Sequence, residues 1–131
     1  MIRHASCSCG QLTLACSGEP VRVSICHCHA CQKRTGSPFG EQARFPLEQV
    51  TVEGRSTPYV RVGDSGDPAT FYFCPICGAT VYWQAKQLPA FIAVAVGAFA
   101  DANFPAPQVS VYEERAHPWV MPATGGMEHM D

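Results

Sequence analysis

Apolar and polar residues alternate with a period of two in several short segments of the chain. In residues 11–16 this alternation places Leu12, Leu14 and Cys16 on one face, as in a half-buried strand. The other strands predicted from the pattern cover residues 21–25, 50–52, 59–62, 69–74, 79–84, 91–96 and 109–113. Residues 91–96 are apolar on both faces, which favours a central strand, although a short apolar run also fits a buried helix.

Signals for helices are weak. A single short helix is predicted over residues 30–34, ended by Gly36. Glycine and proline number 11 each and only 15% of residues are charged, which favours short strands joined by turns. We therefore predict a mainly β (all-β) fold with little helix, in one domain over residues 1–121, followed by a flexible tail over residues 122–131.

Charge and hydropathy exclude several kinds of partner. The formal net charge of -2 provides no basic field for a phosphate backbone, so nucleic acid is not expected as a partner. The longest apolar run, residues 90–100, is shorter than the roughly 20 residues that cross a bilayer. The first ten residues have no apolar stretch typical of a signal peptide. We expect a cytoplasmic protein with no membrane partner.

Eight cysteines carry the main chemical signal. In a reducing compartment, clustered cysteines are more often metal ligands or redox groups than disulfides. Seven of them form three clusters: Cys7 and Cys9 (the first), Cys26, Cys28 and Cys31 (the second), and Cys74 and Cys77 (the third). Cys16 stands apart on the apolar face of its strand, where we interpret it as a buried structural thiol.

The third cluster has the spacing of a metal-binding turn. Sulfur ligands around tetrahedral zinc lie about 3.8 Å apart, and a C-x-x-C turn brings two sulfurs to that separation. Pro75 stiffens this turn and Gly78 allows the chain to leave it with a positive φ. The cluster would form a knuckle at the tip of a hairpin over residues 69–84, and it supplies half of a structural site.

Counting favours one way of completing that site. Seven clustered cysteines divide into four and three, and a three-ligand site leaves one zinc coordination position open for water or substrate. The economical assignment joins the first and third clusters and leaves the second as the open site. The spacing alone also permits the third cluster to pair with Cys28 and Cys31.

Two histidines lie within the second cluster. His27 and His29 could complete a coordination sphere or act as a base, but we favour solvated or second-shell roles for both. The cluster could also be a redox centre, although three thiolates so close together would bind zinc readily.

The order of the cysteine motifs resembles that of a known family. C-x-C-G, then C-x-C-x-x-C followed by QKRTGS, then F-C-P-x-C-G is similar to the glutathione-dependent formaldehyde-activating enzymes, which share a domain with centromere protein V. Residues 65–82, 96–101 and 118–119 also resemble the family, so the resemblance covers roughly residues 5 to 120.

The resemblance implies a zinc-binding β-sheet fold similar to Mss4. It implies two zinc ions per chain, a structural ion bound by Cys7, Cys9, Cys74 and Cys77 and a catalytic ion bound by Cys26, Cys28 and Cys31. The implied activity is that of a carbon–sulfur lyase, which in reverse joins formaldehyde and glutathione into S-hydroxymethylglutathione. Small thiols and aldehydes would then be the partners, with glutathione as co-substrate.

Physical chemistry suits an open zinc site for such a reaction. A free thiol with a pKa near 8.5 is mostly protonated at neutral pH, whereas coordination deprotonates it. Three thiolate ligands make the ion a poor Lewis acid, so we favour delivery of the thiol over polarisation of the aldehyde. Arg34, Thr35 and Ser37 flank this site and could contact a substrate carboxylate, or could serve only to cap the loop.

Two other functions remain open from the sequence. The chain could be a non-catalytic zinc module that binds a protein partner, or a protein for thiol redox or metal buffering at the second cluster. The acidic balance argues against a chromatin-like role.

Overall fold

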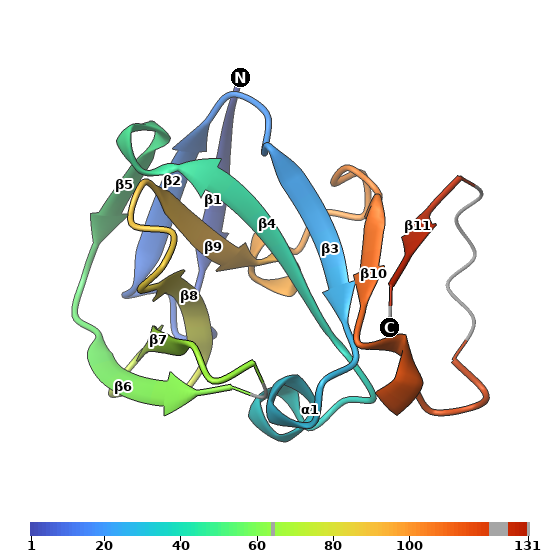
Figure 1. The fold of residues 1–131 in the computed structure, drawn as a ribbon. Coiled ribbons are helices and arrows are strands. Elements are labelled where there is room, and N and C mark those ends of the chain that lie inside the picture. The colour runs from blue at the N-terminus through green and yellow to red at the C-terminus, as the bar shows by residue number, and fades with distance from the viewer. Residues whose placement is uncertain (64, 121–125, 131) are drawn as a thin grey trace.

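The computed structural model describes residues 1–63, 65–120 and 126–130 (Figure 1). Its strands form two sheets, one of three strands in the order β1-β2-β5 and one of eight in the order β11-β10-β3-β4-β9-β8-β7-β6. The smaller sheet comprises β1 (Ile2–Ser6), β2 (Thr13–Ser17) and β5 (Val50–Glu53). The larger sheet comprises β3 (Arg22–Cys26), β4 (Gly40–Pro46), β6 (Thr57–Val62), β7 (Pro68–Phe73), β8 (Thr80–Ala85), β9 (Phe91–Ala95), β10 (Val109–Val111) and β11 (Glu128–His129).

Helical structure is confined to short pieces. The α-helix α1 (His29–Thr35) follows β3 and ends at Gly36, which adopts the left-handed conformation expected of a C-cap. Three 3₁₀ turns span Leu47–Gln49, Val96–Phe99 and Glu113–Arg115. The all-β prediction is confirmed, and no helix among the described residues is long and apolar enough to span a membrane.

The two sheets share one apolar core. Leu12, Leu14 and Cys16 contribute to it from the smaller sheet side, and fully buried residues of the larger sheet face them: Val23, Ala43, Phe45, Val81 and Val94. Cys16 is 0% exposed and belongs to neither cysteine group that could hold a metal. Burial raises the pKa of its thiol to about 11. A structural thiol in the core accounts for it.

Most predicted strands are present, with small shifts at their ends. The apolar segment 91–96 gives β9, which lies between β4 and β8 at the centre of the larger sheet. Residues 69–84 form the antiparallel hairpin of β7 and β8. The last predicted strand, over residues 109–113, ends earlier at Val111, because Tyr112 takes a left-handed φ of 54° and turns the chain into a 3₁₀ turn.

Three strands were missed, and each lacks a clear apolar alternation. In β1 only Ala5 is buried. In β4 the three buried residues are Gly40, Ala43 and Phe45, and charged residues separate them. The two-residue β11 pairs in parallel with β10. It lies within the predicted tail, whose residues 122–125 and 131 are outside the described part, and the flexibility of the tail stays a prediction.

Candidate metal centres and the adjoining pocket

The first and third cysteine clusters meet at one end of the two sheets. Cys7 and Cys9 follow β1, whereas Cys74 and Cys77 form the turn between β7 and β8. The four sulfurs all lie within 4.8 Å of one another. The Cys9 sulfur is 3.6 Å from that of Cys7 and 3.7 Å from that of Cys74. These distances match the edges of a zinc–sulfur tetrahedron, which are about 3.8 Å long.

Hydrogen bonds from the surrounding chain reach these sulfurs and favour the thiolate form of Cys74. The Leu12 N–H donates to the Cys7 sulfur at 3.3 Å. Burial by itself would raise the pKa of Cys74, but donation from the Cys77 N–H, the Gln11 side chain and the Ile76 N–H lowers it to about 6. Metal binding to cysteine requires deprotonated sulfur, so this donor set fits zinc.

A glycine follows each of the two cysteine pairs of this group and completes its turn. The Gly10 N–H donates to the Cys7 carbonyl and the Gly78 N–H to the Cys74 carbonyl, at 3.1 and 2.8 Å. Both glycines have φ near +80°, which side-chain-bearing residues rarely adopt. The turns are therefore similar knuckles, although only the second has the C-x-x-C spacing.

The second cluster is built by the junction of β3 and α1. Cys26 ends β3, Cys28 is the N-cap residue of α1 and Cys31 lies in its first turn. The Cys31 N–H donates to the Cys28 sulfur at 3.3 Å. The three sulfurs lie within 4.8 Å of one another and no fourth His, Cys, Asp or Glu among the described residues joins the group. Three sulfurs leave one position of a tetrahedral ion for another ligand.

The thiols of this cluster influence one another strongly. Hydrogen bonds from Cys26 and Cys28 hold the pKa of Cys31 far below its usual range, and the positive charges of Arg34 and Arg61 lower it further. Hydrogen bonding to Cys28 and Cys31 raises the pKa of Cys26 instead. The two arginines and the neighbouring thiols thus favour the thiolate form of Cys31, the form that binds metal ions.

The histidines of the second cluster lie in different surroundings. His27 is 1% exposed, its ring Nε2 is 3.0 Å from the Ser110 hydroxyl, and its backbone N–H donates to the Val111 carbonyl. These contacts tie the cysteine loop to β10. His29 is exposed and lies outside both metal groups.

Arg34, Thr35 and Ser37, the three predicted substrate contacts, also lie in different surroundings. Thr35 donates its hydroxyl to the Cys31 carbonyl at 2.9 Å and accepts a hydrogen bond from the Ser37 N–H at 3.1 Å. Both residues therefore close the C-terminal end of α1. Arg34 instead lines a pocket of about 540 Å³ beside the second cluster. Their contact with a substrate stays a prediction.

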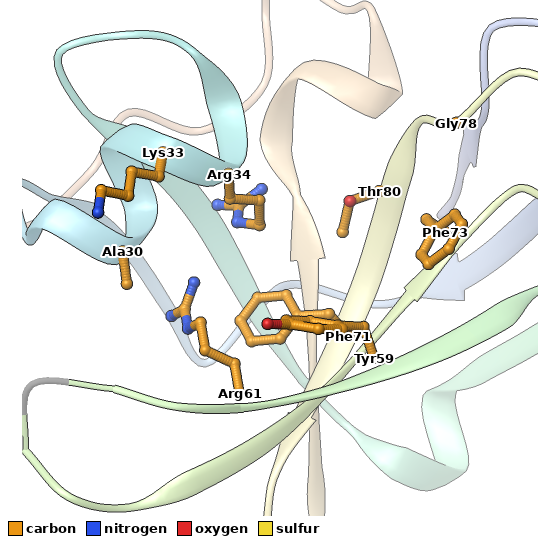
Figure 2. A pocket seen from close by; sticks show the side chains of 9 residues that line it. All are labelled: Ala30, Lys33, Arg34, Tyr59, Arg61, Phe71, Phe73, Gly78 and Thr80. Carbon is orange, nitrogen blue, oxygen red and sulfur yellow. The ribbon is translucent and has the colours of Figure 1, made fainter.

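This pocket lies between α1 and the β6–β7–β8 part of the larger sheet (Figure 2). Arg34 extends from α1 toward the sheet, and Arg61 extends from β6 toward α1. The described residues of the lining are Ala30, Lys33, Arg34, Tyr59, Arg61, Phe71, Phe73, Gly78 and Thr80. Arg61 and the aromatic residues were not predicted from the sequence as part of a binding site. The period-two relation of Tyr59 to Arg61, and of Phe71 to Phe73, places each pair on one strand face. Only the pairing of β6 with β7 sets Tyr59 opposite Phe71.

Both arginines pack on aromatic rings. The Arg34 guanidinium carbon is 4.3 Å from the centre of the Trp83 ring, and that of Arg61 is 4.2 Å from the Phe71 ring. Phe71 and Trp83 are themselves stacked, with 5.1 Å between ring centres. Cation–π contacts fix the planes of both guanidinium groups. The pocket therefore presents two oriented cations over an apolar floor.

Comparisons with known proteins agree with this architecture. A family model described as "Glutathione-dependent formaldehyde-activating enzyme" matches residues 2–115. A crystal structure of a protein from Rhodobacter sphaeroides, solved as a structural-genomics target, has a TM-score of 0.58 and 20% sequence identity. The superposition covers 98% of this chain and 99% of that chain. At this identity the likeness shows the fold alone. No curated protein matches the sequence.

Proposed function

The chain belongs to the glutathione-dependent formaldehyde-activating enzyme family, and we propose that it forms and breaks carbon–sulfur bonds between a small thiol and an aldehyde with the help of zinc. In Enzyme Commission terms this is a carbon–sulfur lyase, and glutathione and formaldehyde are the substrates that the family name suggests. One observation carries the proposal: a three-sulfur group with room for one more ligand lies beside a pocket of substrate size.

The two cysteine groups suit different roles. The four sulfurs from the first and third clusters would fill a tetrahedral ion and join the two sheets, as structural zinc does. The second cluster would hold a second zinc ion with one free position, where a coordinated substrate thiol would be kept as the thiolate. The nucleophile would thus be supplied at neutral pH.

The residues of the pocket would bind and orient the substrates. Arg34 and Arg61 are close enough to Cys31 to affect its charge, so an anionic thiol held by them would have its sulfur near the cluster. Phe71 is buried and, with Phe73, walls the pocket against water. Holding thiol and aldehyde together in this space would accelerate their reaction mainly through proximity and orientation.

The proposal is tested by adduct exchange. Formaldehyde and glutathione combine without a catalyst, so the rate of exchange between free and adduct formaldehyde is measured by NMR with and without the zinc-loaded protein. We expect a large acceleration that falls by about 10²-fold or more in Cys28→Ser. Cys16→Ala is the matched control, because Cys16 lies outside both groups.

Metal content separates the proposal from its alternatives. The proposal expects two zinc ions per chain, one of which is lost in Cys28→Ser while the fold is kept. Equal exchange rates in Cys28→Ser and Cys16→Ala would contradict it. Two bound ions without any accelerated exchange would instead favour a zinc module that binds a protein partner.

A further inference from the structure

Arg34 and Arg61 carry buried N–H groups without partners. The Nε of Arg34 and the Nε and Nη1 of Arg61 are shielded from water and form no hydrogen bond, although the Arg34 side chain also bonds to Cys31. Neither arginine forms an ion pair with a carboxylate of the described residues, whereas the largely buried Arg3 contacts the exposed Glu19 at 3.3 Å. A buried donor without an acceptor is costly, and more so when it is charged. Two such groups in one pocket indicate a ligand that supplies the acceptors.

The neighbouring cysteines do not balance this positive charge. Three thiolates and one divalent ion would together carry a single negative charge. Arg34 and Arg61, with Lys33 at the exposed rim, bring three positive charges to the same pocket. Two positive charges therefore remain. A ligand that carries one thiolate and one carboxylate would neutralise them.

The walls of the pocket restrict the rest of the ligand. Apart from the three cations, the described residues that line it carry aromatic, methyl or hydroxyl groups, and none of these described residues is an acid. Among them, Tyr59 and Thr80 offer the side-chain oxygens that could accept a hydrogen bond. A ligand with an ammonium group or several amide N–H groups would leave these donors poorly paired, whereas an apolar body would fit the Phe71 and Phe73 rings.

One acid lies in an adjoining cavity. Glu41 lines a second hollow, which shares Arg34, Gly78 and Thr80 with the pocket. The ammonium group of glutathione would have to reach Glu41 to be paired. A zwitterionic thiol such as glutathione is therefore the ligand to compare with a simple mercaptocarboxylate.

We propose that the pocket binds a small mercaptocarboxylic acid, whose carboxylate lies between Arg34 and Arg61 and whose apolar body packs on the aromatic wall. The sulfur then points toward the second cysteine cluster. This identifies the class of thiol for the proposed carbon–sulfur chemistry and rests on that function for the role of the sulfur. The carboxylate site depends only on the two arginines and the rings beneath them.

Binding is measured on the zinc-loaded protein by the fluorescence of Trp83, which is 6% exposed and lies under Arg34. The other tryptophan, Trp119, is 69% exposed and is replaced by phenylalanine to remove its signal. The probes are 3-mercaptopropionate, 2-mercaptoethanol, cysteamine, glutathione and the thiol-free benzoate. Calorimetry gives a second measure of each affinity.

We expect 3-mercaptopropionate to bind about 10- to 100-fold more tightly than 2-mercaptoethanol, because it adds charge-assisted hydrogen bonds to two guanidinium groups. Arg61→Gln should remove most of this difference and also weaken benzoate. Arg44→Gln is the matched control, since Arg44 also packs on a ring, that of Phe91, but does not line this pocket. Metal content and circular dichroism verify that both variants are folded.

Several results would overturn the proposal. Equal affinities for 3-mercaptopropionate and 2-mercaptoethanol would do so, as would equal effects of Arg61→Gln and Arg44→Gln. Glutathione binding more tightly than 3-mercaptopropionate, with Glu41→Gln abolishing the preference, would show a zwitterionic ligand instead.

The same measurements distinguish this inference from the proposed function. If benzoate binds through Arg61 but no thiol gives accelerated adduct exchange, the function is wrong and the carboxylate site stands. If the protein accelerates adduct exchange of neutral thiols as much as that of mercaptocarboxylates, and no carboxylate binds, the function stands and this inference is wrong.

Discussion

Replacing Gly54 with alanine tests how firmly the four-cysteine centre is joined to the smaller sheet. Gly54 follows β5 with a φ of +99°. A Cβ atom at this position would overlap the Gln11 carbonyl oxygen and lie 2.8 Å from its carbonyl carbon. The Gln11 side chain in turn donates to the Cys74 sulfur at 2.9 Å and exchanges two hydrogen bonds with the Arg55 backbone, at 2.8 and 2.9 Å. The added methyl group must therefore displace the residue that joins the sheet to the four-cysteine group.

The cost follows from these contacts. A positive φ costs an alanine about 1–2 kcal/mol. Separating Gly54 from Gln11 also breaks the two hydrogen bonds to Arg55, each worth about 1 kcal/mol net. With the bond to Cys74 strained as well, we expect a loss of about 4 kcal/mol, a large part of the 5–15 kcal/mol typical of a domain.

Urea unfolding of the zinc-loaded protein measures this loss. At a slope of about 2 kcal/mol/M, the midpoint should fall by about 2 M. Zinc should also pass to a chromogenic chelator faster than from the unmodified protein. Gly63→Ala is the control, because its φ is not positive and no atom lies within 4 Å of the added Cβ. It should leave stability unchanged or raise it by up to about 1 kcal/mol.

The reasoning would be refuted if Gly54→Ala and Gly63→Ala unfolded at the same urea concentration. A lower midpoint with unchanged zinc release would refute only the connection through Gln11.

Three further predictions concern the cysteine loops and the last strand. Cys77→Ser should destabilise the whole domain and lower its thermal midpoint more than Cys28→Ser, because the four-cysteine group joins distant segments; calorimetry showing equal midpoints would contradict this. Ser110→Ala removes the hydroxyl 3.0 Å from His27 Nε2 and leaves a buried ring nitrogen unpaired, so urea unfolding should show a loss of about 1–3 kcal/mol; a smaller loss than Ser8→Ala on the exposed turn would argue against it. The hydrogen bond with His129 lowers the pKa of Glu113. A carboxylate whose pKa is lower in the folded chain stabilises the fold at any pH above its pKa in the unfolded chain, which is about 4.3. This contribution is lost as the pH falls through the lower pKa of the folded chain. The protection of the Met130 amide against hydrogen exchange, relative to its intrinsic rate at each pH, should therefore fall in acid, because this amide bonds to Ser110 in the folded chain. Glu113→Gln should remove that pH dependence of the protection.

Local patterns predicted the cysteine knuckle and most of the strands. The C-x-x-C turn and its glycine form one hydrogen-bonded unit, so their geometry follows from adjacent residues alone. Strands such as β2 and β9 bury apolar residues on regular faces, and that burial is what the period of two reports. The metal groups of four and three cysteines also match the division favoured by counting.

Strands β1 and β4 escaped prediction because their partners stabilise them more than their own side chains do. Ala5 is the single buried residue of β1, which pairs with β2 over five residues. Strand β4 lies between β3 and β9 in the larger sheet, and its polar residues are half-buried against these neighbours. In β4, backbone hydrogen bonds to the two flanking strands compensate for a weak apolar pattern.

The amino-acid sequence by itself determined that this chain carries clustered thiols in a β-rich domain, because ligand spacing and strand alternation are local properties of neighbouring residues. Only the tertiary structure decided which clusters meet and what surrounds them. Cys7 reaches Cys74 through the packing of two sheets, and Arg61 reaches Arg34 because β6 is paired to the sheet that α1 covers. Such contacts depend on strand order and register across many intervening residues, which no local pattern encodes.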